Sequence, residues 1–242
     1  MRILYSEAMQ SPRLLVFDLD GTLVDSRIDL ANSVNAMLAH YGRPALSQEV
    51  IAGYIGEGAG ALVRRSLAHA HLIAGQPDPH DDALIDEALR HFIHFYRIHK
   101  LDFTYVYEGV IDALEHIRLC HPQLPMAVLT NKPVIPSRAI CTHFGFDRFF
   151  FRVYGGNSFA TKKPDPEGLM QLIADASVLT GRPITVQETI LVGDSHIDVQ
   201  TARSCGARSL GCSYGLSPET LALARPDLTV AHPGEWPASL GL

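Results

Sequence analysis

The stretch that decides the fold is F-D-L-D-G-T-L-V-D-S, residues 17–26, which follows the apolar residues 14–16. A continuous apolar run of this length is typical of a parallel strand covered on both faces. Asp18 and Asp20 come at its end, and if the extended conformation continues to residue 20, their carboxylates point the same way. Such carboxylates repel each other unless a cation or a shared proton lies between them. The stretch therefore predicts a strand that ends in a charged site.

Length and composition are those of a folded enzyme. The chain has 242 residues, 47% of them hydrophobic and 19% charged, and its net charge is −6 with histidine neutral. This balance argues against general binding to nucleic acid or to anionic membranes, so we expect a small-molecule partner. The four cysteines form no C-x-x-C pair, and neither a signal peptide nor a membrane span is evident. We expect a cytoplasmic monomer or homodimer that starts at Met1 or Met9.

Two kinds of sequence pattern divide the chain. Short strand-like runs occupy residues 14–17, 126–129, 149–153, 189–192, 208–211 and 228–230. Residues 27–101 instead show helical periodicity, with helices expected at 28–41, 47–53, 59–70 and 81–100. The pattern predicts an α/β fold, in which a doubly wound parallel-sheet core of residues 11–26 and 102–242 carries an all-helical insertion, residues 27–101.

The residues that follow the predicted strands carry the chemistry. In a parallel α/β sheet, ligands bind outside the carboxyl ends of the strands. The segments found there are Thr130-Asn131, Lys162-Lys163 before a proline, and Asp194-Ser195 with Asp198. A hydroxyl and an amide can hold phosphate oxygens, and the spacing of Asp194 and Asp198 puts both carboxylates on one side of a helix start. These segments are expected to meet Asp18 and Asp20.

The four motifs, in this order, resemble those of the haloacid dehalogenase (HAD) superfamily of phosphohydrolases, and the insertion lies where that family carries a helical C1 cap. The resemblance implies a Rossmann-like core. It implies that Asp18 is the nucleophile that becomes an aspartyl-phosphate and that Asp20 is the general acid and base. It also implies Mg²⁺, bound by Asp18, by Asp194 and by the backbone carbonyl of Asp20.

The same resemblance assigns the groups that hold the phosphoryl oxygens. Two ionised carboxylates and a dianionic phosphoryl group carry about four negative charges against two on magnesium, so one more cation is needed. Lys163 is expected to supply it, with Lys162 as the alternative. Thr130 and the Asn131 backbone are expected to bind the phosphoryl oxygens. Asp198 is expected to orient Lys163 or a metal-bound water, supported by Ser195.

Asp20 favours a phosphatase, because dehalogenases lack an aspartate two positions after the nucleophile. Residues 54–62, 213–217 and 225–227 resemble the phosphoglycolate phosphatase branch. This predicts Mg²⁺-dependent hydrolysis of a small phosphomonoester similar to phosphoglycolate. Gly56 and Gly58 are expected in a loop that closes over the substrate, with Arg64 or Arg65 as a carboxylate partner.

Several alternatives stay open at this point. A mutase of the β-phosphoglucomutase type fits less well, because Thr22 and Leu30 stand where that family has Val and His. A pyrophosphatase, a nucleotidase and a phospho-accepting signalling domain are the others. Asp194 or Thr130 could also serve only as a helix cap, and Lys163 or Arg64 only as a surface charge.

Overall fold

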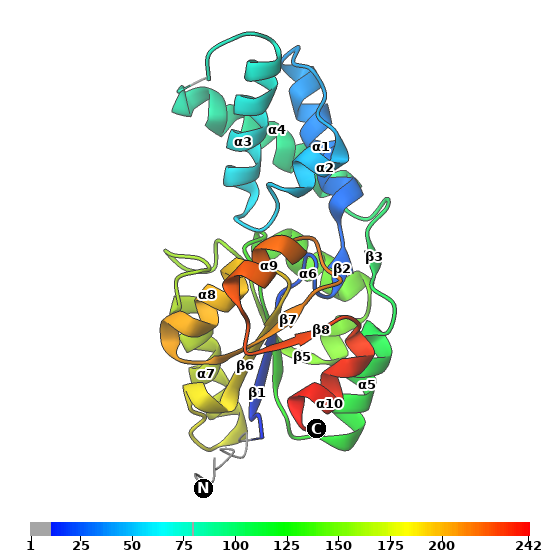
Figure 1. The fold of residues 1–242 in the computed structure, drawn as a ribbon, viewed down its shortest axis with the longest axis vertical. Helices are drawn as coiled ribbons and strands as arrows, with labels where there is room; N and C mark the ends of the chain where they lie inside the picture. Colours follow the sequence, from blue (N-terminus) through cyan, green and yellow to red (C-terminus); the bar gives the residue numbers. More distant parts are fainter. Residues whose placement is uncertain (1–10, 79) are drawn as a thin grey trace, which may run out of the picture.

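The computed structural model describes residues 11–78 and 80–242, so the predicted start at Met1 or Met9 lies outside the described residues. In these ranges, six strands form one parallel sheet in the order β5-β4-β1-β6-β7-β8 (Figure 1). The strands are β1 (Leu14–Phe17), β4 (Met126–Leu129), β5 (Phe150–Tyr154), β6 (Thr189–Gly193), β7 (Arg208–Cys212) and β8 (Leu228–Val230). The predicted α/β fold is confirmed, and every predicted strand forms within one residue of its expected bounds.

The sheet is buried on both faces, which explains the unbroken apolar runs. Successive strand residues point to opposite faces, so Leu15 and Phe17 join one hydrophobic core while Leu14 and Val16 join another. The first core also contains residues of α5 (Val110–Cys120), α6 (Val134–His143) and α10 (Trp236–Leu240). The second contains residues of α7 (Glu167–Thr180) and α8 (His196–Cys205). The remaining elements here are α9 (Pro218–Ala224) and the 3₁₀ helices η1 (Phe146–Arg148), η2 (Val186–Glu188) and η3 (Pro233–Glu235).

Four helices form a separate layer above the carboxyl ends of the strands (Figure 1). They are α1 (Arg27–His40), α2 (Gln48–Ala52), α3 (Ala59–Ile73) and α4 (Asp82–His99). All four predicted helices form, and they share a buried cluster that includes Val34, Leu67 and Phe92. We call this layer the cap. We propose the predicted boundaries, 27–101 for the cap and 11–26 with 102–242 for the core, as the domain division.

Two short strands, which the sequence patterns did not predict, connect the cap to the core. They are β2 (Val24–Asp25) and β3 (Tyr105–Val106), which pair antiparallel. Two residues are too few to show a strand period, so no sequence pattern indicates these strands. Beside them, the buried carboxylate of Asp29 accepts hydrogen bonds from the Thr104 backbone N–H and hydroxyl, at 2.8 and 2.7 Å. The two chain crossings between cap and core are therefore tied together.

Within the described part of the chain, none of the helices combines the length and the apolar character that a membrane crossing requires.

Candidate active site

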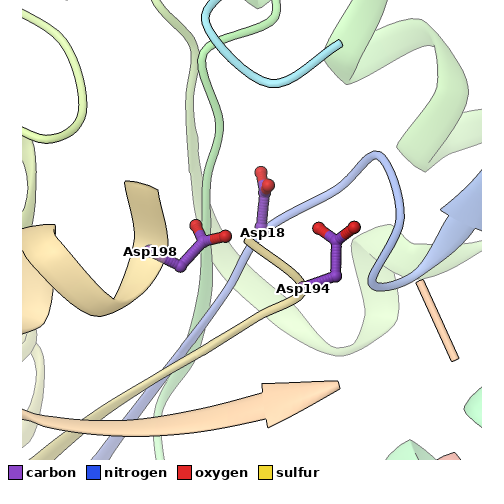
Figure 2. Close-up of side chains that lie close together, drawn as sticks. All are labelled: Asp18, Asp194 and Asp198. Atoms are coloured by element: carbon purple, nitrogen blue, oxygen red, sulfur yellow. The ribbon is translucent and has the colours of Figure 1, made fainter. Parts of the chain in front are cut away.

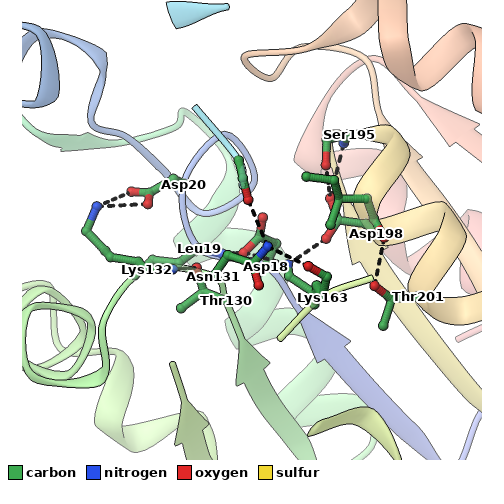
Figure 3. Close-up of polar contacts among 12 residues, drawn as sticks. Asp18, Leu19, Asp20, Thr130, Asn131, Lys132, Lys163, Ser195, Asp198 and Thr201 are labelled. Carbon is green, nitrogen blue, oxygen red and sulfur yellow. Dashed lines mark hydrogen bonds and ion pairs between the residues drawn. The ribbon is translucent and has the colours of Figure 1, made fainter. Parts of the chain in front are cut away.

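A buried lysine lies between two buried carboxylates, one at the carboxyl end of β1 and one in the first turn of α8. Lys163 Nζ lies 2.9 Å from Asp18 Oδ1 and 2.6 Å from Asp198 Oδ1 (Figure 3). The three residues are 4%, 7% and 1% exposed, so solvent does not screen their charges. Asp198 is fixed in turn, because its Oδ2 accepts hydrogen bonds from the Ser195 backbone N–H and hydroxyl at 3.1 and 2.7 Å. The structure thus brings the predicted cation, Lys163, to the predicted nucleophile, Asp18.

Asp194 completes a cluster of carboxylates with Asp18 and Asp198 (Figure 2). One oxygen of each lies within 4.8 Å of the others, and all three residues are buried. The cap of α8 is Ser195 and not Asp194, which leaves the Asp194 carboxylate for the cluster. Gly21 is required opposite it: its φ is +85°, and a Cβ there would lie 2.2 Å from Asp194 Oδ2.

The charges of this cluster call for a cation beyond Lys163. Burial, together with the nearby Asp198 and Asp18, raises the pKa of Asp194 well above its usual value. Burial likewise raises the pKa of Asp18 to about 6, although the neighbouring Lys163 opposes the shift. Buried carboxyl oxygens that are costly to ionise without a cation are a donor set suited to a hard ion such as Mg²⁺. The residues present therefore fit the predicted metal.

Asp20 points away from this cluster and has its own lysine. Lys132 Nζ lies 2.9 and 2.8 Å from the two carboxylate oxygens of Asp20 (Figure 3). The Ser26 hydroxyl also donates to Asp20 Oδ1, at 2.6 Å. The prediction that the Asp18 and Asp20 carboxylates point the same way required an extended conformation up to residue 20. β1 ends at Phe17 instead, so the two carboxylates do not share one cation. The side chain of Asp20 is not part of the carboxylate cluster, so a metal-binding role rests on its backbone carbonyl alone.

Lys132 is a site residue that the sequence motifs did not predict. It follows Thr130-Asn131 directly, it is 6% exposed, and the adjacent Asp20 carboxylate outweighs burial and raises the pKa of its ammonium. Its position next to the predicted phosphate-binding pair is the only sequence feature that could have indicated a role in the site. That position does not indicate which carboxylate the ammonium contacts.

The loop after β4 contacts the cap loop at Gly56 and the loop that carries Lys163. Thr130 is buried, and its hydroxyl accepts a hydrogen bond from the Lys132 backbone N–H at 3.2 Å. The N-cap position of α6 is Pro133, so Thr130 is not the cap of that helix. The Asn131 side-chain amide donates to the carbonyls of Gly56 and Lys163 at 3.0 and 2.9 Å. This side chain therefore joins a cap loop to the predicted cationic loop.

The glycine loop of the cap lines the site, whereas the predicted arginines do not. Gly56 and Gly58 line the cavity described below, and Lys162 Nζ donates to the Glu57 carbonyl at 2.6 Å. Arg64 instead pairs with Asp82 at 3.0 Å, and Arg65 pairs with Glu57. Neither arginine is among the residues that line the cavity.

A cavity of about 490 Å³ lies between the cap and the core. Asp18, Asp20 and Lys132 line its core side, and Tyr96, Arg97 and Lys100 of the cap line the opposite side. Most of the remaining lining is apolar and includes Leu30, Ile55, Leu62, Phe92 and Ile135. A concave, largely apolar site with a few convergent polar groups is the usual form of a small-molecule site.

Residues 15–212 match the family described as haloacid dehalogenase-like hydrolase. The chain belongs to this family. The resemblance predicted from the four motifs is thereby confirmed, and the chain is a hydrolase-family enzyme.

Individual relatives of this family agree with the assignment. A phosphoglycolate phosphatase of Pseudomonas putida is 38% identical over 234 residues, which cover 92% of this chain and 79% of that protein. One from Chromobacterium violaceum is 37% identical, covering 90% and 91%. A solved structure of a predicted phosphoglycolate phosphatase from Haemophilus somnus superposes with a TM-score of 0.83 at 30% identity, covering 94% of this chain and 97% of that one.

Proposed function

We propose that the protein hydrolyses a small phosphomonoester in a Mg²⁺-dependent reaction that passes through an aspartyl-phosphate on Asp18. The observation that carries the proposal is the buried group at the ends of β1 and β6, in which Asp18 contacts Lys163 at 2.9 Å and lies beside Asp194. A nucleophile, a fixed ammonium and a carboxylate set for a hard cation together suit phosphoryl transfer.

In this proposal, a carboxylate oxygen of Asp18 attacks phosphorus, and the bond from phosphorus to the ester oxygen breaks. Asp20 donates a proton to the departing oxygen and then removes one from the water that attacks the phosphoenzyme. The Lys163 ammonium balances charge on the phosphoryl oxygens, and Asp198 holds it in place at 2.6 Å. Thr130 and the Asn131 backbone bind the same oxygens.

Mg²⁺, held by Asp18, Asp194 and the Asp20 carbonyl, would supply further electrostatic stabilisation of that charge.

For the substrate, we propose a small phosphorylated metabolite of which phosphoglycolate is the first to test. The names of the relatives support phosphoglycolate. Arg97 and Lys100 are the cap cations on the cavity and could bind a substrate carboxylate, a role expected earlier for Arg64 or Arg65. The cavity volume of about 490 Å³ leaves room for larger esters, so the panel includes sugar phosphates and nucleotides. We also propose that the protein acts in the cytoplasm.

The experiment is phosphate release by wild-type protein with Mg²⁺, with a chelator, and in Asp18→Asn. We expect turnover that is lost in the last two conditions. Asp25→Asn is the matched control, because Asp25 is a buried aspartate of the same stretch whose carboxylate contacts Arg27 and Tyr105 instead of the cluster. Turnover retained in Asp18→Asn contradicts the nucleophile, and isomerised sugar phosphate without free phosphate would indicate a mutase. A phosphoenzyme that persists for hours would indicate the signalling alternative.

A further inference from the structure

The carboxylate of Asp20 is held by two core groups. Lys132 Nζ contacts both carboxylate oxygens, at 2.9 and 2.8 Å, and the Ser26 hydroxyl donates to Oδ1 at 2.6 Å. The Lys132 side chain is 4% exposed and that of Asp20 is 12% exposed, so water competes weakly with this ion pair. The direction in which Asp20 points is therefore set by where the Lys132 ammonium lies.

The Lys132 ammonium also contacts the cap. It lies 4.7 Å from the centre of the Tyr96 ring, which belongs to α4 and is 4% exposed. The Tyr96 ring stacks on that of Phe92, one turn earlier on the same face of α4, with ring centres 5.7 Å apart and planes within 3° of parallel. An ammonium over an aromatic face is attracted to it, most strongly when both are removed from water.

We propose that Lys132 and Tyr96 are positioning residues for Asp20: Lys132 aims its carboxylate, and Tyr96 makes that aim depend on the position of cap helix α4. The inference rests on the proposed function, in which Asp20 is the general acid. The lysine stem has four rotatable carbons, so the ammonium needs a second contact to stay in one place. Tyr96 supplies this contact only while α4 lies over the core.

This arrangement links substrate enclosure to proton donation. Asp20, Lys132 and Tyr96 all line the cavity between cap and core. When α4 moves away from the core, the ring leaves the ammonium, and the Asp20 carboxylate keeps the Ser26 hydrogen bond but is paired with a less constrained Lys132. Proton donation to the leaving oxygen is then efficient only with the cap in place over the cavity.

The test compares substrates that differ in their need for a general acid. An alkyl phosphate such as phosphoglycolate has a strongly basic leaving oxygen and needs a proton, whereas 4-nitrophenyl phosphate has a leaving group that departs unprotonated. A well-placed general acid contributes about 10²- to 10⁴-fold. We therefore expect Lys132→Met to lower kcat/KM by about 100-fold or more for the alkyl phosphate and much less for 4-nitrophenyl phosphate.

Variants of Tyr96 test the cap contact separately. For Tyr96→Leu we expect a loss of about 5- to 30-fold on the alkyl phosphate, the strength of a buried cation–π contact, and a much smaller loss on 4-nitrophenyl phosphate. Tyr96→Phe keeps the ring face and removes only the hydroxyl, so it should lose clearly less activity on the alkyl phosphate than Tyr96→Leu. Tyr54→Leu is the matched control, since this cap tyrosine contacts His69 and not Lys132. Lys132→Arg, which keeps the charge, should show the same substrate bias with a smaller loss and serves if Lys132→Met does not fold.

The outcomes distinguish a failure of the proposed function from a failure of the positioning roles of Lys132 and Tyr96. Wild-type protein without Mg²⁺-dependent turnover of either substrate contradicts the proposed function and the inference with it. Active wild-type protein whose Lys132 and Tyr96 variants lose activity equally on both substrates contradicts the inference alone, because a structural role weakens both reactions alike. The same holds if Tyr96→Phe falls as far as Tyr96→Leu.

Discussion

Replacing Lys163 by Met tests the charge balance of the site most informatively. Lys163 Nζ contacts Asp18 at 2.9 Å and Asp198 at 2.6 Å, and its side chain is 2% exposed. Removing one partner of a buried ion pair costs about 3–5 kcal/mol, because the remaining charges stay buried without compensation. We therefore expect Lys163→Met to lose about 3–5 kcal/mol in its free energy of unfolding at neutral pH without metal.

The same substitution should remove phosphatase activity. A fixed cation or donor that stabilises transition-state charge is worth about 10²- to 10³-fold in kcat, so we expect kcat to fall at least that far while the protein stays folded. Unfolding is followed in urea by the fluorescence of Trp236, the single tryptophan, which is fully buried. Activity is measured as kcat and KM with the best substrate of the panel.

Lys162→Met is the matched control, because it removes a neighbouring ammonium that contacts the cap-loop carbonyl of Glu57 instead of the carboxylates. Its free energy of unfolding should stay within about 0.5 kcal/mol of wild type, as is usual for surface changes, and KM should change more than kcat. The reasoning is wrong if Lys162→Met loses kcat and Lys163→Met retains it.

Three more predictions follow from the same geometry. The pKa of Asp18 is raised from 3.8 to about 6 in the fold, so the folded state binds a proton that the unfolded chain has released, and stability falls as pH rises through this window. In Asp18→Asn, Lys163 keeps Asp198 as its partner at 2.6 Å, so no buried ammonium is left unpaired. The free energy of unfolding of metal-free Asp18→Asn, measured in urea, should therefore exceed that of wild type at pH 7.5 by up to about 3 kcal/mol, with no such gain at pH 3.5; a less stable variant at pH 7.5 contradicts this. Saturating Mg²⁺ should stabilise wild type by about 1–3 kcal/mol, seen as a higher melting temperature, and should stabilise Asp18→Asn much less. If the melting temperature rises equally in the two proteins, the ion binds elsewhere. Gly58 has φ +88°, and a Cβ there would lie 2.9 Å from the Asn131 carbonyl oxygen. Such backbone strain costs about 1–3 kcal/mol, so Gly58→Ala should lower kcat/KM about tenfold or more. Gly60→Ala is the control, because an added Cβ at Gly60 would meet open space. If the two substitutions lower kcat/KM equally, backbone strain at Gly58 is not the cause.

The sequence predicted those parts of the fold that depend on local pattern. The apolar runs of β1 and β4 are buried on both faces and bounded by polar residues, so their type and ends were readable. The rule that ligands bind at the carboxyl ends of parallel strands then placed Asp18, Asp194 and the Lys162-Lys163 pair together without any pairwise information. The choice of Lys163 within that pair came from the family resemblance.

The contacts that the sequence did not predict join residues far apart in the chain. Lys132 and Asp20 are 112 positions apart, and nothing near Lys132 indicates its partner. Tyr96 follows the apolar period of α4, so its sequence position indicates a core residue and not a contact with an ammonium. The orientation of the cap helices also decides that Arg97 and not Arg64 lines the cavity, and helical periodicity does not fix that orientation.

The central claim is that Asp18 takes the phosphoryl group, and chemical trapping tests it directly. The enzyme is quenched with acid during turnover of its best substrate, and borohydride then reduces an acyl phosphate on aspartate to homoserine, which mass spectrometry locates in the sequence. We expect homoserine at residue 18, dependent on substrate and absent from Asp18→Asn. Unmodified Asp18 during active turnover, or homoserine at Asp20 or Asp194, would contradict it.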